Sequence, residues 1–477
     1  MLAKDYKGYK GLPVLAGLET MEDAIAKGLT VAESVSRLKR YHWTARRLTL
    51  LLTSRITSMP IYELKMAFGL HAHYLAEHTE AFFNRVREMR EPPYGMDSTP
   101  HEALELLLDE IERAPETEPF LLGVYGVLVP AFADALRAQI AEDNKLFDHP
   151  TYRVLRWALL EVQDIADYGK KALEIFITDE VKTRYAGWVG LLQDCLGAMG
   201  GLDGTEEQES VELSRQFSLR PFSYDGVPVR DERFKDVYNM GVNAEAFLLD
   251  RENAALPKTI MLYFKRMREI DVPEMMASII RETKDKPWAY YKDMIRQMWD
   301  ESRHAMMGEV GFTSIDIDWK RIPFNLTWSY LLNTRMSPKD RHAILFFIEQ
   351  GLMPAKTGKQ YEWEVGVATA NRLTALIQDY DWADEVLHAR IGRDWLVPEL
   401  GGQAAAMEYG NKAWSEALQD SYDKFEREGL TGHANWWTEI YRDACKFWGI
   451  EPDPKVLAYN LSYRDSRPDR EELTTTK

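Results

Sequence analysis

A nine-residue pattern that occurs twice constrains this 477-residue chain more than any other feature. The segments 300–308 and 384–392 both read Asp-Glu-x-x-His-Ala-x-x-Gly, and each lies in a stretch that favours helix. On an α-helix, residues i and i+3 share a face, so each copy aims one carboxylate and one imidazole at the same point. Two such helices that face each other would offer both pairs of side chains to a pair of metal ions.

The repetition is what gives the pattern its weight. A single Glu-x-x-His is common on solvated helix faces, whereas a second copy with the same flanking Asp, Ala and Gly is unexpected by chance. Apolar neighbours such as Met298 and Ile391 predict that both copies are buried, and the small Ala and Gly residues would let helices approach closely. The alternative is a pair of buried glutamate–histidine hydrogen bonds inherited from an internal duplication.

Composition excludes several classes of protein. The formal charge of −17 argues against general nucleic-acid binding, which needs a basic surface. No stretch approaches 18 uninterrupted apolar residues and residues 1–18 lack a signal-peptide core, so we expect no membrane partner. Cys195 and Cys445 cannot form a disulfide framework, which favours a cytoplasmic location.

Helical periodicity dominates the chain and predicts the all-α class. The length is too great for one ordinary core. A Gly-rich and acidic stretch separates two helical halves. We therefore expect an N-terminal bundle over 1–199, a linker over 200–233, a C-terminal bundle over 234–463 and a disordered tail over 464–477. The helices are expected at 32–56, 61–90, 100–113, 119–145, 150–178, 180–198, 234–268, 273–309, 324–352, 356–395 and 403–448.

A carboxylate-bridged dinuclear site also takes one carboxylate from each of two further helices. Counting away from a turn at Pro273 places Glu245 level with Glu301, with Glu252 as the alternative on the same face. The second carboxylate should come from the helix before Glu385. Glu349 follows five apolar residues there, and isolated acids of this kind are rarely buried unless they are paired or metal-bound.

Glu362 and Glu364 compete with Glu349 for this second role. Asp300 and Asp384 directly precede the motif glutamates and are candidate acceptors for the N–H group of a metal-bound imidazole, although they are equally compatible with a solvated position. Carboxylate and imidazole donors suit Fe(II) or Mn(II). The expected metal ligands are therefore Glu245, Glu301, His304, Glu349, Glu385 and His388.

With long helices around them, the twin Asp-Glu-x-x-His motifs resemble the ferritin-like superfamily of dinuclear carboxylate proteins. The resemblance covers about residues 235–395 and is closest to the ferritin-like proteins without an assigned reaction. It implies a four-helix bundle with a dinuclear iron or iron/manganese centre that handles O2 or peroxide. The motif residues match the superfamily one by one, whereas Glu245 and Glu349 match by position only.

The N-terminal half suggests a diverged second bundle. Aligning Glu77 with the first motif gives Glu-x-x-Glu, and Glu161 lies where the second motif would fall, again without histidine. This predicts two ferritin-like bundles in tandem, of which the N-terminal one is structural.

The expected function is an O2-dependent oxidase or oxygenase that acts on a small organic substrate. Its cofactors would be two iron ions or an iron/manganese pair, and a homodimer is compatible with the sequence. Two alternatives stay open. One is a metal-binding or iron-handling protein without substrate turnover, and the other is a structural helical scaffold whose glutamates and histidines satisfy one another.

Overall fold

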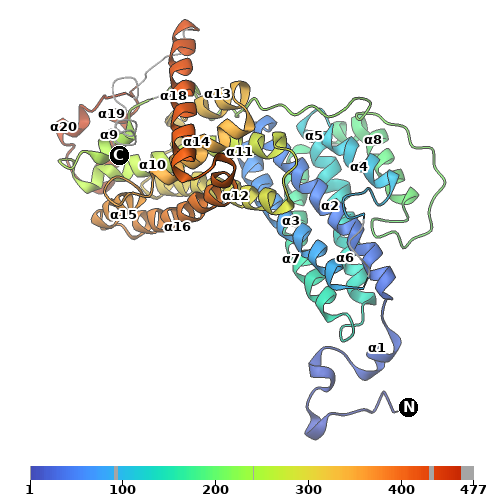
Figure 1. The fold of residues 1–477 in the computed structure, drawn as a ribbon. Helices are drawn as coiled ribbons and strands as arrows, with labels where there is room; N and C mark the ends of the chain where they lie inside the picture. The colour runs from blue at the N-terminus through green and yellow to red at the C-terminus, as the bar shows by residue number, and fades with distance from the viewer. Residues whose placement is uncertain (1, 91–94, 240, 429–434, 463–477) are drawn as a thin grey trace. The chain divides into compact units, whose positions relative to one another are not determined.

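The computed structural model describes residues 2–90, 95–239, 241–428 and 435–462 (Figure 1). The tail expected over 464–477 lies outside these residues. Within the described ranges the chain forms helices, and the only strand-like pairing is an isolated bridge between Val242 and Ser462. The predicted all-α class is confirmed.

The chain divides into two compact units. The N-unit comprises Met1–Leu52 and His71–Ser223, and the C-unit comprises Thr53–Leu70 and Tyr224–Lys477. The expected bounds differ from this division in two places. Thr53–Leu70, the tip of a long helical hairpin, belongs to the C-unit, and residues 200–223 of the expected linker belong to the N-unit. Periodicity shows that such a hairpin exists but not which core its tip joins.

Each helix expected in the N-terminal half is present near its expected bounds. The apolar segment Thr117–Glu142 is the one described segment long and apolar enough to cross a membrane, and 72% of its most apolar window is buried, as in the core helix of a bundle. The helices are α1 (Met21–Ala26), α2 (Val31–Ser58), α3 (Tyr62–Glu88), α4 (Glu102–Glu112), α5 (Thr117–Leu121), α6 (Val129–Glu142), α7 (His149–Phe176) and α8 (Asp179–Ala198), with short helical turns at Tyr9–Gly11 and Val14–Gly17 and a π-helical turn at Leu122–Leu128.

In the C-terminal half, each of the five long helices expected from the sequence is divided in two. Local caps explain two of the breaks: Ser337 and Asp340 form a capping box, and the Asn371 side chain accepts hydrogen bonds from two backbone N–H groups. The helices are α9 (Ala244–Leu249), α10 (Ala255–Arg268), α11 (Asp271–Glu282), α12 (Trp288–Ser314), α13 (Thr327–Arg335), α14 (Pro338–Gly351), α15 (Lys359–Ala368), α16 (Arg372–Trp395), α17 (Val397–Leu400), α18 (Gln403–Arg427), α19 (Trp437–Trp448) and α20 (Pro454–Leu457), with a turn at Trp319–Arg321.

The two motifs lie on α12 and α16, which pack against each other. Each motif glycine permits the close approach of a further helix. A Cβ atom on Gly308 would lie 2.3 Å from the backbone nitrogen of Met267 on α10, and one on Gly392 would lie 2.3 Å from the Phe346 ring on α14. The expectation that small residues let helices approach closely is confirmed, and α10 and α14 are the helices concerned.

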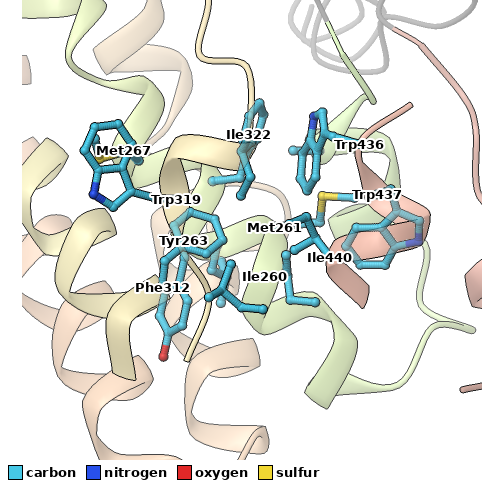
Figure 2. Packing of buried hydrophobic residues seen from close by; sticks show 14 of the residues in the cluster. Ile260, Met261, Tyr263, Met267, Phe312, Trp319, Ile322, Trp436, Trp437 and Ile440 are labelled. Atoms are coloured by element: carbon cyan, nitrogen blue, oxygen red, sulfur yellow. The ribbon is translucent and has the colours of Figure 1, made fainter. Parts of the chain in front are cut away.

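A cluster of buried apolar side chains fixes the position of α10 in the C-unit. Figure 2 shows Met261 and Tyr263 of α10 among side chains from α12 and α19. Trp437 stacks on Tyr441 with nearly parallel rings and donates a 2.7 Å hydrogen bond to the carbonyl of Val456. Burial of so many large side chains around α10 fixes its position beside α12.

Candidate metal centre

Two groups of four buried or half-buried side chains meet between the helices of the C-unit. Within each group the candidate donor atoms all lie within 4.8 Å of one another, and Glu385 belongs to both groups. Group A comprises Glu301, Glu349, Glu385 and His388, and group B comprises Glu269, His304, Asp381 and Glu385. The donors come from the end of α10 and from α12, α14 and α16, so each of these four helices contributes.

The structure brings five of the six expected ligands into these groups. Glu245 is not among them, because its carboxylate lies 2.6 Å from Arg268 and 3.9 Å from Lys265. The alternative Glu252 pairs with Lys455 at the surface. The register was counted from Pro273 as a turn between two long helices, but α11 begins at Asp271 and intervenes before α12.

Glu269 and Asp381 are the donors that sequence reasoning missed. Glu269 directly follows α10 and belongs to group B, to which the expected Glu245 does not. Asp381 lies one turn before Glu385 on α16, and this i, i+4 spacing on the motif face was a signal that could have found it. Of the competitors of Glu349, Glu362 is buried against Lys265 and Arg266, whereas Glu364 is exposed and accepts from Gln360.

Each motif aspartate contacts the histidine of the other motif. His304 Nε2 lies 3.1 Å from Oδ2 of Asp384, and His388 Nε2 lies 3.4 Å from Oδ2 of Asp300. Both aspartates lie at hydrogen-bond distance from an imidazole, as expected, and each contacts the histidine of the other helix. With an N–H on Nε2 donated to a carboxylate, Nδ1 is left as the nitrogen that can bind a metal.

Both Nδ1 atoms face Glu301, which lies between them. Oε1 of Glu301 is 3.2 Å from His388 Nδ1, and Oε2 is 3.6 Å from His304 Nδ1. Both Nδ1 atoms are buried and make no hydrogen bond, and the same holds for one oxygen each of Glu349 and Glu385. Carboxylate oxygens lie 3.2–3.6 Å from these two nitrogen atoms, and buried carboxylates and imidazoles crowded together without hydrogen bonds fit a bound cation.

Without a metal, the pKa values of the two motif histidines are shifted upward, although burial alone would lower them. Burial works against a charged His304 imidazole, but the surrounding carboxylates of Asp384, Glu269 and Glu301 outweigh it and raise the pKa to about 10. For His388, burial is likewise outweighed by its carboxylate partners and the pKa is raised well above its ordinary value. A metal ion that binds Nδ1 must therefore take the place of a proton.

The glutamates of group A crowd one another. Burial, together with the charge of Glu385, raises the pKa of Glu349 well above its ordinary value. Burial also opposes ionisation of Glu385, but the Lys359 ammonium overcomes it and lowers the pKa of Glu385 well below that of a free glutamate. A divalent cation between these carboxylates would offset the repulsion that contributes to the raised pKa of Glu349.

Two buried cations lie against group B. Lys359, the first residue of α15, is 1% exposed, and its Nζ lies 2.9 and 3.0 Å from the Asp381 oxygens and 2.8 Å from Oε1 of Glu385. Arg266 of α10 is fully buried and pairs with Asp381 and, at 2.9 Å, with Glu269. Neither residue was expected at the site.

The N-unit lacks a comparable arrangement among its described residues. Glu77 is exposed, and Glu161 lies 2.7 Å from Nε2 of His78. His71 is buried with its Nδ1 2.9 Å from the hydroxyl of Tyr125. In the part of the chain that the structure describes, both groups with metal-ligand geometry lie in the C-unit.

No family model matches the chain, and no curated protein or solved structure matches it significantly. The resemblance to the ferritin-like superfamily therefore rests on the sequence motifs.

Proposed function

We propose that this chain is a ferritin-like metalloprotein whose C-unit holds a dinuclear iron or iron/manganese centre. Group A would hold one ion and group B the other, with Glu385 shared between them. We propose further that the protein is an O2-dependent oxidase or oxygenase for a small organic substrate. The N-unit would be a diverged second bundle that carries no metal.

One observation carries this proposal. The two motif histidines turn their Nδ1 atoms, which make no hydrogen bond, toward the same glutamate, while the aspartate of the opposite motif holds each Nε2 atom. Histidines that merely satisfied the glutamate of their own motif would not leave buried nitrogen and oxygen atoms without hydrogen bonds. This donor set, with oxygen and imidazole ligands and no thiolate, suits iron and manganese.

When bound, such a centre supplies redox chemistry with O2. The residues of the chain prepare the place for it. Asp300 and Asp384 fix the orientation of the imidazoles, and Glu301 and Glu385 each present two oxygens to different partners in the centre. Nearly complete burial of Asp300, Glu301 and Glu385 excludes bulk water, which strengthens every charge interaction inside.

The second candidate is a structural scaffold, and the cations of group B favour it. Lys359 and Arg266 already neutralise Asp381, Glu269 and one side of Glu385. Under this alternative the centre is a buried ion network that needs no metal. The two candidates differ in what the loss of one histidine does.

The test uses the full chain, purified without O2 and supplied with Fe(II). Metal content, O2 consumption and thermal melting are measured for the wild type, His304→Ala and His388→Ala. The control is His342→Ala, which removes another buried histidine of the C-unit that belongs to neither group. We expect the first two variants to lose metal and O2 consumption, and His342→Ala to keep both.

The outcomes separate the candidates. A wild-type protein that binds no metal, with lower melting temperatures for both motif variants, would support the scaffold. Metal binding without O2 consumption would overturn the enzyme and leave a metal-binding or iron-handling protein.

A further inference from the structure

We infer that Lys359 is a built-in cation that occupies the group B metal position, so that the two positions of the centre differ in affinity. A metal ion fills group A first, and a second ion enters group B only when the Lys359 ammonium moves away. This inference rests on the proposed metal centre and adds to it an order of loading.

The position of the Lys359 ammonium carries the first step. Its nitrogen lies within 3.0 Å of both Asp381 oxygens and of one Glu385 oxygen, and 3.6 Å from Oε1 of Glu269. Those three residues are the carboxylate donors of group B. The ammonium thus lies among the oxygens that a metal ion at that position would need, in a place that is 1% exposed.

Group A differs from group B in its contacts with lysine and arginine side chains. In the described part of the chain, no lysine or arginine nitrogen lies within ion-pair distance of Glu301 or Glu349, whose partners are histidines and the side-chain amide of Gln297. Its only contact with a fixed cation is through the shared Glu385. Apart from the His388 imidazole, the three carboxylates of group A therefore have, among the described residues, no positive partner other than Lys359 at the shared Glu385, which favours a divalent ion there.

The two motif helices show the same asymmetry in sequence. Four residues before the first motif glutamate stands the neutral Gln297, and four residues before the second stands Asp381. Gln297 donates a 3.2 Å hydrogen bond to Glu349, whereas Asp381 binds Lys359 and Arg266. The repeat thus departs from symmetry at the position where group B gains an acid together with its buried cations.

The order of loading follows from charge repulsion between the Lys359 ammonium and the second metal ion. An ammonium and a divalent ion that share carboxylate oxygens would stand only a few ångströms apart in a buried site, where such repulsion is strong. The second ion must therefore displace Lys359 from Asp381 and Glu385, and the free energy of those ion pairs is subtracted from its binding. Lys359 has a long, flexible side chain at the start of α15, which permits this displacement.

The test is an anaerobic titration of the full chain with Co(II), in which binding is monitored by calorimetry and by visible absorption. For the wild type we expect one tight equivalent and a second that binds at least ~10-fold more weakly. In Lys359→Met the second step should tighten by ~10-fold or more, while the first step changes less. The metal-free variant should melt at a lower temperature than the metal-free wild type, because Asp381 and Glu385 lose a buried partner. Addition of Co(II) should raise the melting temperature of the variant again.

Lys265→Met is the matched control. It removes another buried lysine of the same unit, whose partners Glu362 and Glu245 belong to neither group, so the gap between the two steps should stay as in the wild type. If Lys359→Met does not fold alone, it and Lys359→Gln are refolded with Co(II). The inference predicts folded protein with two ions, and failure to fold under these conditions overturns it.

The result also distinguishes this inference from the proposed centre. Two steps of equal affinity in the wild type, or an unchanged gap in the folded Lys359 variants, would overturn the inference and leave the centre standing. No binding of Co(II) in any variant would overturn the centre itself, and the inference with it.

Discussion

The Nε2 atom of His304 lies 3.1 Å from Oδ2 of Asp384, an aspartate that belongs to the other motif helix. The reciprocal pair, His388 and Asp300, is 3.4 Å apart. Each histidine is therefore oriented by the helix it faces and not by its own. As a result, neither donor group can form unless α12 and α16 are both correctly placed.

Because Asp384 contacts the histidine of the other helix, the effect of replacing it can be predicted. Asp384→Asn should weaken metal binding by ~10–100-fold without removing a ligand, because the imidazole of His304 loses the carboxylate that fixes its orientation. The measurement is a Co(II) titration under anaerobic conditions. Asp394→Asn, an exposed position on the same helix, is the control and should bind as the wild type does. Equal weakening in both variants would show that the His304–Asp384 pair has no special role.

A second prediction concerns the asymmetry between the two units. Glu301→Gln and Glu385→Gln should sharply reduce the metal content, since both residues lie within the donor groups. Glu77→Gln and Glu161→Gln should leave it nearly unchanged, because Glu77 is exposed and Glu161 pairs with His78. Elemental analysis of the four variants decides the matter. Comparable losses from both pairs would place a real metal site in the N-unit.

A third prediction concerns the motif glycine of α12. Gly308→Ala should lower the free energy of unfolding by about 1–3 kcal/mol, because its Cβ would stand 2.3 Å from a backbone nitrogen of α10, which cannot turn aside as a side chain can. Metal affinity should fall as well, since α10 carries Glu269 toward the site.

Gly187→Ala in α8 is the control, because a Cβ there meets no other atom within 4 Å. That variant should be neutral or more stable by up to ~1 kcal/mol. Both are measured by urea denaturation and metal titration. A Gly308→Ala protein as stable as the wild type would mean that α10 and α12 are not in close contact.

The N-terminal helices could be predicted closely from the sequence, whereas the C-terminal ones could not. The motif residues and Glu349 came from patterns that are local to one helix. Glu269 was missed because its position depends on α11, a short helix between two elements that had been taken as directly joined. Tertiary packing against α10, not local periodicity, determines that register.

Lys359 illustrates the other limit of sequence reasoning. A lysine at the first position of a helix is disfavoured by the helix dipole, and such local conflicts often mark functional sites. This unfavourable position is visible in the sequence, but it does not identify the residues that Lys359 contacts. Only the fold shows that the start of α15 brings the ammonium to Asp381 and Glu385.

A fourth prediction concerns pH and the N-unit. Burial lowers the pKa of His71 to about 3 in the folded protein, whereas a histidine in the unfolded chain titrates near ~6.5. Between these values the unfolded chain binds one more proton. Stability should therefore rise with pH from about 3 to ~6.5, by at most ~1.4 kcal/mol per pH unit from this residue, and then level off.

His71→Gln should flatten this rise, as measured by urea denaturation of the full chain at several pH values below 7. His149→Gln, a histidine nearer the surface, is the control and should keep the wild-type profile. A His71→Gln profile as steep as that of the wild type would show that other groups cause the dependence.

The central claim is that a metal ion binds between the two motif helices, and anomalous diffraction tests it most directly. Crystals of the full chain grown with Mn(II) should show an anomalous peak within bonding distance of Glu301, Glu349, Glu385 and His388, with a weaker second peak near His304. A saturating concentration of Mn(II) or Fe(II) that gives no peak among these side chains, with Lys359 and Arg266 still paired to Asp381, would contradict the account.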